Sequence, residues 1–314
     1  MSNSDRINYN GDLDLLIDEV CQAYQLGAIL DYKPIDTGYE DFNVKIATSK
    51  GHFLAKMLSK DRTPKEIERY ATIITKVTEA GINRPRPLPS PQQGIVFNYG
   101  GVEMIVSEFI EGNTFFELDR SPNDAERQAI IELAAKINSL DYKPPFYDDS
   151  WSVTNIRKMY AKVQPFLDLD DQSMLEKTLG RYDNIPVDLP HAFVHGDIIT
   201  TNVVKGDDGE ISILDFSVAN WYPRIQELAV MASSLLSGKS LRQRCQLIID
   251  DYEKFAILQP VEKQKLYDYA LAAVAMELIG AYHARHFEDN NSSENDHWLS
   301  LGREELAREM ANIN

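Results

Sequence analysis

The sequence predicts an α+β protein built from a small antiparallel sheet followed by a mainly helical region. Short strand-like segments separated by turn residues fill the chain before about residue 110. Apolar residues then recur at helical spacing from Ser121 onward, and again through residues 241–314. Because a chain of 314 residues is long for a single hydrophobic core, we expect two lobes.

The sheet is expected from three segments near the N-terminus. Residues 32–46 have the pattern of a strand, a turn and a second strand, and a turn at residues 49–51 leads into residues 52–58. Lys56 lies in this otherwise apolar third segment. A buried charge needs a partner, which makes Lys56 a candidate functional residue; a solvated lysine on the outer face is the alternative.

A helix follows the third segment. Thr63 supplies the N-cap and Pro64 the first helical position, and apolar residues continue at helical spacing to Gly81. Two glutamates lie in its first turns. Glu66 shares the apolar face, whereas Glu68 points to the opposite side.

The most informative segment is HGDIITTN, from His195 to Asn202, followed by an apolar strand that ends at Asp215. Its residue types suit phosphoryl transfer. Asp197 can accept the proton of an attacking hydroxyl, while Asn202 and Asp215 supply oxygen ligands for magnesium.

The local pattern brings these two oxygen ligands together. Residues 202–205 and 211–214 are strand-like, and the turn residues 206–209 join them into a hairpin. Asn202 begins one strand and Asp215 ends its partner, so both lie at the same end. A surface loop whose side chains only cap turns is the alternative. The histidine, the hairpin and the distal aspartate together favour phosphoryl transfer.

Composition limits the partners. The chain has 32 Lys and Arg residues against 49 Asp and Glu residues, a formal net charge of −17 at pH 7. This acidity argues against nucleic acid as a partner, because it repels phosphates. It is compatible with a cationic substrate, although solubility alone is the simpler explanation.

Signals for export or membrane insertion are absent from the sequence. No run of about 18 apolar residues occurs, and the N-terminal MSNSDRINYNGDLD lacks the basic start and apolar stretch of a signal peptide. Cys21 and Cys245 are far apart and lack metal-ligand spacing, which is typical of thiols in a reducing compartment. We therefore expect a cytoplasmic protein that binds no membrane, and the oligomeric state is not indicated.

The motif from His195 to Asn202, the hairpin and Asp215 together resemble the aminoglycoside phosphotransferase and choline kinase superfamily, which has a two-lobe protein-kinase-like fold. The resemblance covers about residues 35–235. It implies that Asp197 is the catalytic base and that Asn202 and Asp215 hold the magnesium ions. It also makes His195 a structural residue of the catalytic loop.

The resemblance further implies that ATP is the phosphate donor. Lys56 would contact the α- and β-phosphates and pair with a glutamate of the following helix. We select Glu66 over Glu68 because Glu66 shares the apolar face of that helix. The loop at residues 37–43 takes the place of the phosphate-covering loop and contains one glycine.

The strand-like segment at residues 102–112 resembles the hinge of this superfamily. There the adenine edge pairs with backbone groups, so side-chain identity matters little. The resemblance places these contacts at Ser107 and Phe109, with Ile110 as the alternative in a register shifted by one residue.

The resemblance also divides the chain into three parts. Residues 1–106 form the N-terminal lobe with the ATP-phosphate contacts, and residues 107–112 form the hinge. Residues 113–314 form the C-terminal lobe with the catalytic loop, the metal ligands and the acceptor site. ATP is expected between the lobes.

The segment after Asp215 distinguishes among kinases. Residues 217–223 are short and a helix begins almost at once, so the long activation segment of protein kinases that ends in Ala-Pro-Glu is missing. The acceptor is therefore expected to be a small molecule. Glu227 stands where the superfamily often has aspartate, and we expect it to anchor the catalytic loop.

The sequence thus predicts an ATP- and Mg²⁺-dependent phosphotransferase that moves the γ-phosphate to a hydroxyl of a small molecule. Residues 38–43 and 84–87 resemble homoserine kinase and hydroxylysine kinase members of the superfamily, which is compatible with an amino alcohol or a hydroxy amino acid. An aminoglycoside, choline or a sugar remains open as the acceptor. A catalytically silent nucleotide-binding regulator and a kinase acting on protein are the alternative functions.

Overall fold

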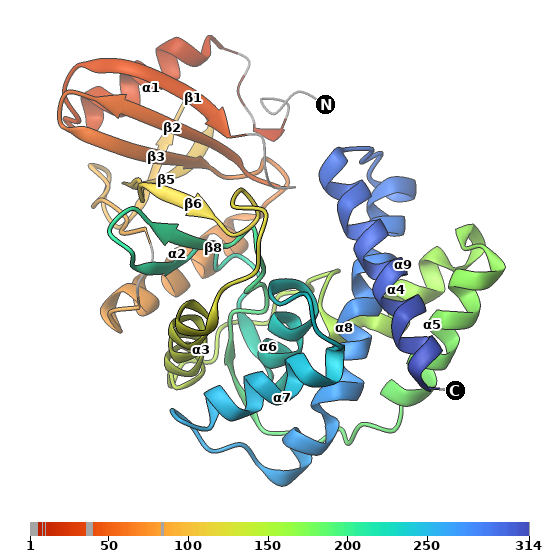
Figure 1. The fold of residues 1–314 in the computed structure, drawn as a ribbon. Helices are drawn as coiled ribbons and strands as arrows, with labels where there is room; N and C mark the ends of the chain where they lie inside the picture. The colour runs from red at the N-terminus through yellow and green to blue at the C-terminus, as the bar shows by residue number, and fades with distance from the viewer. Residues whose placement is uncertain (1–5, 8, 10, 36–39, 83–84, 314) are drawn as a thin grey trace. The chain divides into compact units, whose positions relative to one another are not determined.

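The chain folds into two compact units, Met1–Gly112 and Asn113–Asn314, and each is described by itself. The structure, a computed structural model, describes residues 6, 7, 9, 11–35, 40–82 and 85–313. Strands dominate the first unit and helices the second (Figure 1).

A five-stranded antiparallel sheet in the order β1-β2-β3-β5-β4 forms the first unit. Its strands are β1 (Ile29–Ile35), β2 (Phe42–Thr48), β3 (Gly51–Met57), β4 (Val96–Tyr99) and β5 (Val102–Glu108). The three strands predicted in residues 32–58 are confirmed, and β5 is the strand expected in residues 102–112. β4 lies outside the predicted strands.

Two helices accompany this sheet. α1 (Leu13–Ala23) begins at Asp12, whose side chain accepts the backbone N–H of Asp14. It lies outside the predicted elements and packs its apolar face on the sheet, in one core with residues of β2, β3 and β5. α2 (Pro64–Glu79) begins at the N-cap Thr63, as predicted.

Two predicted features of the first unit fall partly outside the described residues. The phosphate-covering loop expected at residues 37–43 is described only from Glu40 onward, because residues 36–39 lie outside the described ranges. The same limit applies to residues 38–39 and 84 of the segments that resemble homoserine and hydroxylysine kinases.

The second unit is mainly helical. Its helices are α3 (Asp124–Asn138), α4 (Ile156–Val163), α5 (Leu169–Tyr182), α6 (Ile225–Val230), α7 (Leu241–Tyr252), α8 (Pro260–Phe287) and α9 (Ser293–Ile313). α8 packs against α4, α5, α6, α7 and α9, and buried residues occur on all its sides, as in a central helix. None of the helices in the described ranges is both long and apolar enough to cross a membrane.

Two small sheets hold the loops of the second unit. β6 (Gly112–Thr114), β8 (Val203–Gly206) and β9 (Ile211–Ile213) form one, and β7 (His191–Val194) and β10 (Asn220–Pro223) form the other. The predicted hairpin is confirmed as β8 and β9. β10 was expected to be part of a short connection, but it pairs along its length with β7.

Candidate functional site

The motif residues of the second unit lie on the loop between β7 and β8. β9 returns antiparallel to β8, with Val203 opposite Ile213. Beyond this pair, the Leu214 N–H donates to the carbonyl oxygen of Asn202 at 2.8 Å. The end of the hairpin therefore holds Asn202 beside the segment that enters Asp215, as the sequence predicts.

His195 is fully buried and joins this loop to the hairpin. Its Nε2 donates to the Leu214 carbonyl oxygen at 2.8 Å, and its Nδ1 accepts the backbone N–H of Asp197 at 3.1 Å. Burial lowers the pKa of His195 to about 4, so the ring is neutral near pH 7 and carries its proton on Nε2. Since only this neutral form makes both hydrogen bonds, the side chain acts as a structural tie.

Asp197 and Asn202 are in direct contact. Nδ2 of Asn202 donates to Oδ2 of Asp197 at 2.6 Å and to the Asp197 carbonyl oxygen at 3.1 Å. Only the nitrogen of an amide can donate, so these bonds fix the orientation of the Asn202 side chain. Its Oδ1 atom can therefore coordinate a metal ion or accept a hydrogen bond.

Acidic side chains lie close enough to Asp197 to act on its pKa. Burial raises the pKa of Asp197 well above its usual value, and the carboxylates of Asp149, Asp215 and Glu277 raise it further. Burial also raises the pKa of Glu277 to about 7. A cation stabilises such a concentration of carboxylates, whether it is a metal ion or a charged group of a ligand.

Asp215 follows β9 in a left-handed backbone conformation, with a φ of 54°. Residues other than glycine rarely adopt this region, and strain of this kind is concentrated at functional sites. The Oδ1 atom of Asp215 accepts the backbone N–H of Ser217 at 3.2 Å. The turn and this bond together orient the carboxylate.

Glu227 is fully buried on α6 and binds the backbone of the motif loop. Its Oε1 accepts the N–H of His195 at 3.1 Å, and its Oε2 accepts the N–H of Gly196 at 2.8 Å. Gly196 has a φ of 85°, a conformation that favours glycine. Burial raises the pKa of Glu227 to about 7, while the two backbone bonds oppose that rise. The anchoring role expected for Glu227 is confirmed.

The donor set at this site fits a magnesium ion. Asn202 offers an amide oxygen, because its nitrogen is engaged with Asp197, and Asp215 offers a carboxylate. Magnesium takes hard oxygen ligands and keeps several positions for water and phosphate. The excess of negative charge that raises the pKa of Asp197 also favours a bound cation.

Lys56 lies on β3 in the first unit, opposite Asn43 of β2. The residue is 9% exposed, and its Nζ lies 3.1 Å from Oδ2 of Asp41. The same Nζ lies 5.5 Å from the centroid of the Tyr70 ring. Lys56 is therefore a buried, partnered charge, which excludes the alternative of a solvated lysine.

The structure does not bring Glu66 to Lys56. Oε2 of Glu66 accepts the N–H and the hydroxyl of Thr63, at 2.7 and 2.8 Å, and so closes a capping box at the start of α2. These bonds lower the pKa of Glu66. Glu68 is exposed. The structure shows Oε2 of Glu66 in the capping box and not at Lys56. A direct role of Glu66 at a nucleotide site therefore stays a prediction.

The residues predicted for the hinge lie at and just after the end of β5. Ser107 pairs with Leu54 of β3, and the Phe109 N–H donates to the carbonyl oxygen of His52 at 3.0 Å. One amide has one N–H, so this bond occupies the Phe109 donor. Within the part of the chain that is described, the Ile110 N–H makes no backbone hydrogen bond. Adenine contacts at Ser107 and Phe109 stay a prediction, and the backbone favours the alternative register for the amide contact, at Ile110.

Sequence reasoning missed two acidic residues of the second unit that act on Asp197, together with Trp151, which contacts one of them. Asp149 and Glu277 act on the pKa of Asp197, and Oδ1 of Asp149 accepts the Trp151 N–H at 2.9 Å. The Trp151 ring packs on Gly280, where an added Cβ would lie 2.4 Å from it. Gly280 is one helical turn after Glu277 on α8. The sequence signal that could have found Glu277 was its position as a lone acidic residue in an apolar stretch of α8.

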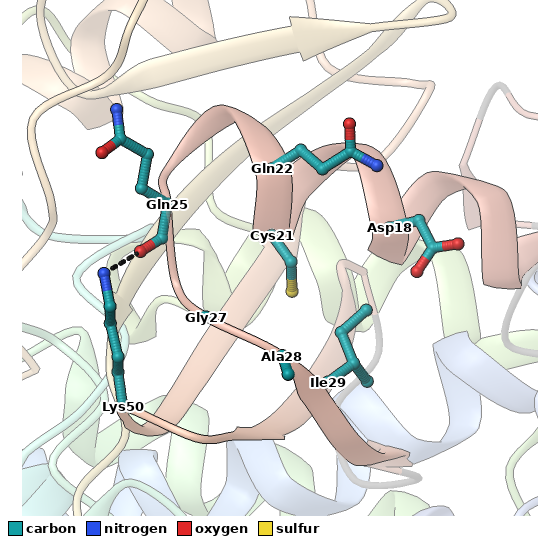
Figure 2. Close-up of a pocket in the computed structure, with 8 residues that line it drawn as sticks. All are labelled: Asp18, Cys21, Gln22, Gln25, Gly27, Ala28, Ile29 and Lys50. Atoms are coloured by element: carbon teal, nitrogen blue, oxygen red, sulfur yellow. Dashed lines mark hydrogen bonds between the residues drawn. The ribbon is translucent and has the colours of Figure 1, made fainter.

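A separate cavity of about 560 Å³ lies in the first unit. Figure 2 shows its lining, which comes from α1, β1 and the segments around them, with Lys50 Nζ bonded to the Gln25 carbonyl oxygen at 2.8 Å. Burial raises the pKa of Cys21 in this lining to about 11, so the thiol stays protonated near neutral pH. The lining residues include none of those predicted for the nucleotide site.

The elements and the motif loop define a protein with a kinase-like fold. The chain belongs to the phosphotransferase enzyme family, whose model matches residues 31–258. The resemblance inferred from the motif is therefore confirmed.

Homoserine kinases are among the relatives of this chain. That of Rhodopseudomonas palustris (strain BisB5) is 26% identical over 215 residues, which are 65% of this chain and 64% of that protein. That of Methylorubrum populi is 24% identical over 249 residues, 77% of this chain and 76% of that protein. The match to the first relative thus spans just under two thirds of its length.

Solved structures share the fold. A spectinomycin phosphotransferase in complex with ADP and spectinomycin has a TM-score of 0.68 at 14% identity, over 93% of each chain. An amicoumacin kinase in complex with AMP-PNP and Ca²⁺ has a TM-score of 0.67 at 13% identity, over 95% of this chain and 94% of that chain. The choline kinase LicA from Streptococcus pneumoniae has a TM-score of 0.64 at 11% identity, over 94% of this chain and 99% of that chain. These likenesses confirm the predicted fold class.

Proposed function

We propose that the protein is an ATP-dependent small-molecule kinase in which Asp197 is the catalytic base. The observation that carries this proposal is the contact of Asp197 with Asn202, on a loop that Glu227 anchors. The relatives reported above are named as kinases or phosphotransferases, which supports the same activity.

In the proposed reaction, the hydroxyl oxygen of the acceptor attacks the γ-phosphorus of ATP. The bond from that phosphorus to the oxygen bridging the β- and γ-phosphates breaks, ADP leaves, and the hydroxyl proton passes to the Asp197 carboxylate. The raised pKa of Asp197 makes its ionised form a stronger base than an ordinary aspartate. Asn202 holds this carboxylate in one orientation, so positioning contributes to the rate.

Asn202 and Asp215 are the proposed magnesium ligands. Bound Mg²⁺ supplies positive charge that offsets the charge on the phosphate oxygens during transfer. Lys56 is the proposed contact to the α- and β-phosphates. The backbone at residues 107–110 is the proposed contact to adenine, with Ile110 favoured over Phe109 as the amide donor because the Phe109 N–H is already used.

The acceptor is proposed to carry a positively charged amine beside its hydroxyl. Asp149 and Glu277 are close enough to Asp197 to raise its pKa, and Trp151 packs on α8 one turn from Glu277. Carboxylates and aromatic faces are the groups that attract an ammonium ion. Homoserine and choline, for which relatives are named, each have a hydroxyl and a cationic nitrogen. An amino alcohol or a hydroxy amino acid matches this chemistry.

The test is ADP release from Mg-ATP with paired acceptors. Each amine-bearing alcohol is run beside its analogue without the amine, for example homoserine beside 4-hydroxybutyrate and ethanolamine beside ethylene glycol, and aminoglycosides and sugars complete the panel. We expect turnover with amine-bearing members only. Asp197→Asn should lower it by about 10²–10⁴-fold, the usual contribution of a general base. Asp207→Asn, at an exposed position in the hairpin turn, is the matched control.

Other outcomes point to the alternative functions. Nucleotide binding without acceptor-dependent turnover indicates a catalytically silent regulator. Transfer of labelled phosphate to proteins, with no small acceptor active, indicates a protein kinase. Equal turnover with and without the amine contradicts the proposed role of Asp149 and Glu277.

A further inference from the structure

We propose that Asp41 is the positioning residue of Lys56, in the place where a helix glutamate was expected. This inference rests on the proposed contact of Lys56 with the phosphates of ATP. It assigns to Asp41 the part in nucleotide binding that was expected of Glu66.

The Asp41 carboxylate contacts Lys56, Arg62 and the backbone N–H of Ser59 in the first unit. The Asp41 side chain is 3% exposed, and its Oδ2 lies 3.1 Å from Lys56 Nζ. Arg62 donates to it twice, from Nε at 2.9 Å and from Nη2 at 3.1 Å. The backbone N–H of Ser59 donates to Oδ1 at 2.9 Å. A buried carboxylate with this set of donors is held in a single position.

The strand register explains why Asp41 reaches Lys56. Asp41 comes one residue before β2, whose first residues pair with the end of β3, including Asn43 with Lys56. Arg62 lies in the connection from β3 to α2, directly before the N-cap Thr63. The Asp41 carboxylate therefore links β2, the β3 lysine and the start of α2.

Lys56 and Arg62 share the carboxylate of Asp41, and Arg62 Nη2 also donates to Oε2 of Glu40 at 2.6 Å. Lys56 Nζ and the Arg62 guanidinium both lie over the Tyr70 ring, 5.5 and 5.8 Å from its centroid. Their positive charges repel each other, and both are largely removed from water, since the Lys56 and Arg62 side chains are 11% and 7% exposed. Removing the charge of Asp41 leaves two buried cations without their shared carboxylate, so Lys56 is expected to leave its present position.

Glu66 offers a direct comparison, because its carboxylate is committed to Thr63. If a helix glutamate positioned Lys56, Glu66→Gln would impair phosphate binding more than Asp41→Asn. Under our proposal the order is reversed, and the effect of Asp41→Asn acts through Lys56.

The experiment measures binding of ADP and of adenosine to the full chain in Mg²⁺ by calorimetry. Adenosine lacks the phosphates, so the ratio of the two affinities reports the phosphate contacts alone. We expect Asp41→Asn to lower ADP affinity by about 10- to 100-fold, the loss for a hydrogen bond to a charged group, and to leave adenosine affinity unchanged. Asp61→Asn, an exposed acidic residue of the same connection, is the matched control and should keep the ratio.

A double-mutant cycle with Lys56→Met tests the route of the effect. In the Lys56→Met background, Asp41→Asn should cause little further loss of ADP affinity. An additive loss, or an unchanged ratio in Asp41→Asn, overturns the inference, as does a larger loss in Glu66→Gln. If Asp41→Asn does not fold, Asp41→Glu keeps the charge but displaces it by one methylene, and an unchanged ratio there overturns the inference equally. Failure of the unmodified chain to bind ADP instead overturns the proposed kinase function.

Discussion

Oε2 of Glu227 accepts the backbone N–H of Gly196 at 2.8 Å, so a side chain of α6 holds the loop that carries Asp197. The second oxygen, Oε1, accepts the neighbouring N–H of His195 at 3.1 Å. A carboxylate can serve two donors in this way because both of its oxygens are acceptors. The loop geometry therefore depends on a residue that belongs to a different element.

Glu227→Gln is expected to destabilise the protein and slow turnover. The amide has one oxygen, so its NH₂ group faces one of the two backbone donors and leaves it unsatisfied. The cost of such a buried group is about 1–3 kcal/mol. Urea unfolding measures this loss, and steady-state kinetics should show a lower kcat with a smaller change in KM. Wild-type values of both stability and kcat in Glu227→Gln would contradict the anchoring role.

Glu277→Gln is expected to stabilise the free enzyme at pH 8 and not at pH 4. The folded protein raises the pKa of Glu277 from 4.5 to about 7, so its stabilising contribution is complete below 4.5 and is lost as the pH rises through 7. This pKa difference corresponds to about 3 kcal/mol. Glutamine carries no charge and can still accept the bond from the Ser234 hydroxyl. Thermal unfolding of the wild type and of Glu277→Gln across this pH range measures the difference in stability. If the two proteins lose stability in parallel as the pH rises, Glu277 does not cause the loss.

The same variant is expected to weaken acceptor binding. Loss of the Glu277 carboxylate should raise KM for the amine-bearing acceptor by about 10-fold or more and leave KM for ATP unchanged, since a charge-assisted contact contributes more than 1 kcal/mol. Kinetics with the acceptor and its amine-free analogue distinguish a contact to the amine from a general effect on the site. An equal change for both compounds would assign Glu277 to the core of the unit rather than to the acceptor.

Gly280→Ala tests the packing of Trp151. The added Cβ would lie 2.4 Å from ring atoms of Trp151, so the ring must move. Overpacking of this kind costs about 1–3 kcal/mol. We expect lower stability together with a higher KM for the acceptor, because Trp151 neighbours Asp149. The emission of tryptophan fluorescence should also shift, whereas an unchanged spectrum and KM would mean that the ring adapts without effect on the site.

Asp215→Asn is expected to abolish measurable turnover and to uncouple nucleotide binding from magnesium. Asparagine tolerates the left-handed backbone at this position and keeps an oxygen for the Ser217 N–H, so the fold should persist. Calorimetry with ADP, in the presence and absence of Mg²⁺, measures the coupling. A variant that still gains ADP affinity from Mg²⁺ as the wild type does would exclude Asp215 as a metal ligand.

The motif loop was predictable because its information is local. His195, Asp197 and Asn202 lie within one short segment, and the hairpin that follows fixes their relation to Asp215 through strand pairing. Turn residues between two strand-like apolar segments predict such a hairpin from sequence alone. The position of Glu227 on the next helix was likewise near enough in the chain to be recognised.

Contacts between distant segments were not predictable in the same way. Asp149 and Glu277 are far apart in the chain, and the tertiary fold brings their carboxylates close enough to Asp197 to raise its pKa. The pairing of Lys56 with Asp41 depends on strand register and on a loop, which side-chain patterns do not specify. In one case a signal was present: Thr63 and Glu66 have the spacing of a capping box, which already accounts for the glutamate.

Glu277, the proposed contact to the acceptor, lies on α8, which packs against α4, α5, α6, α7 and α9. If Glu277 binds the acceptor as proposed, this packing limits which residues of α8 can change when the acceptor changes. A mutation on α8 that suits a new acceptor must also fit the interior of the unit, so most such mutations lower stability before they improve recognition. The segment that bears Asp149 and Trp151 is loop and short helix, where replacements disturb fewer neighbours. Under selection for a new acceptor, substitutions are therefore expected first in this segment and later, if at all, on α8.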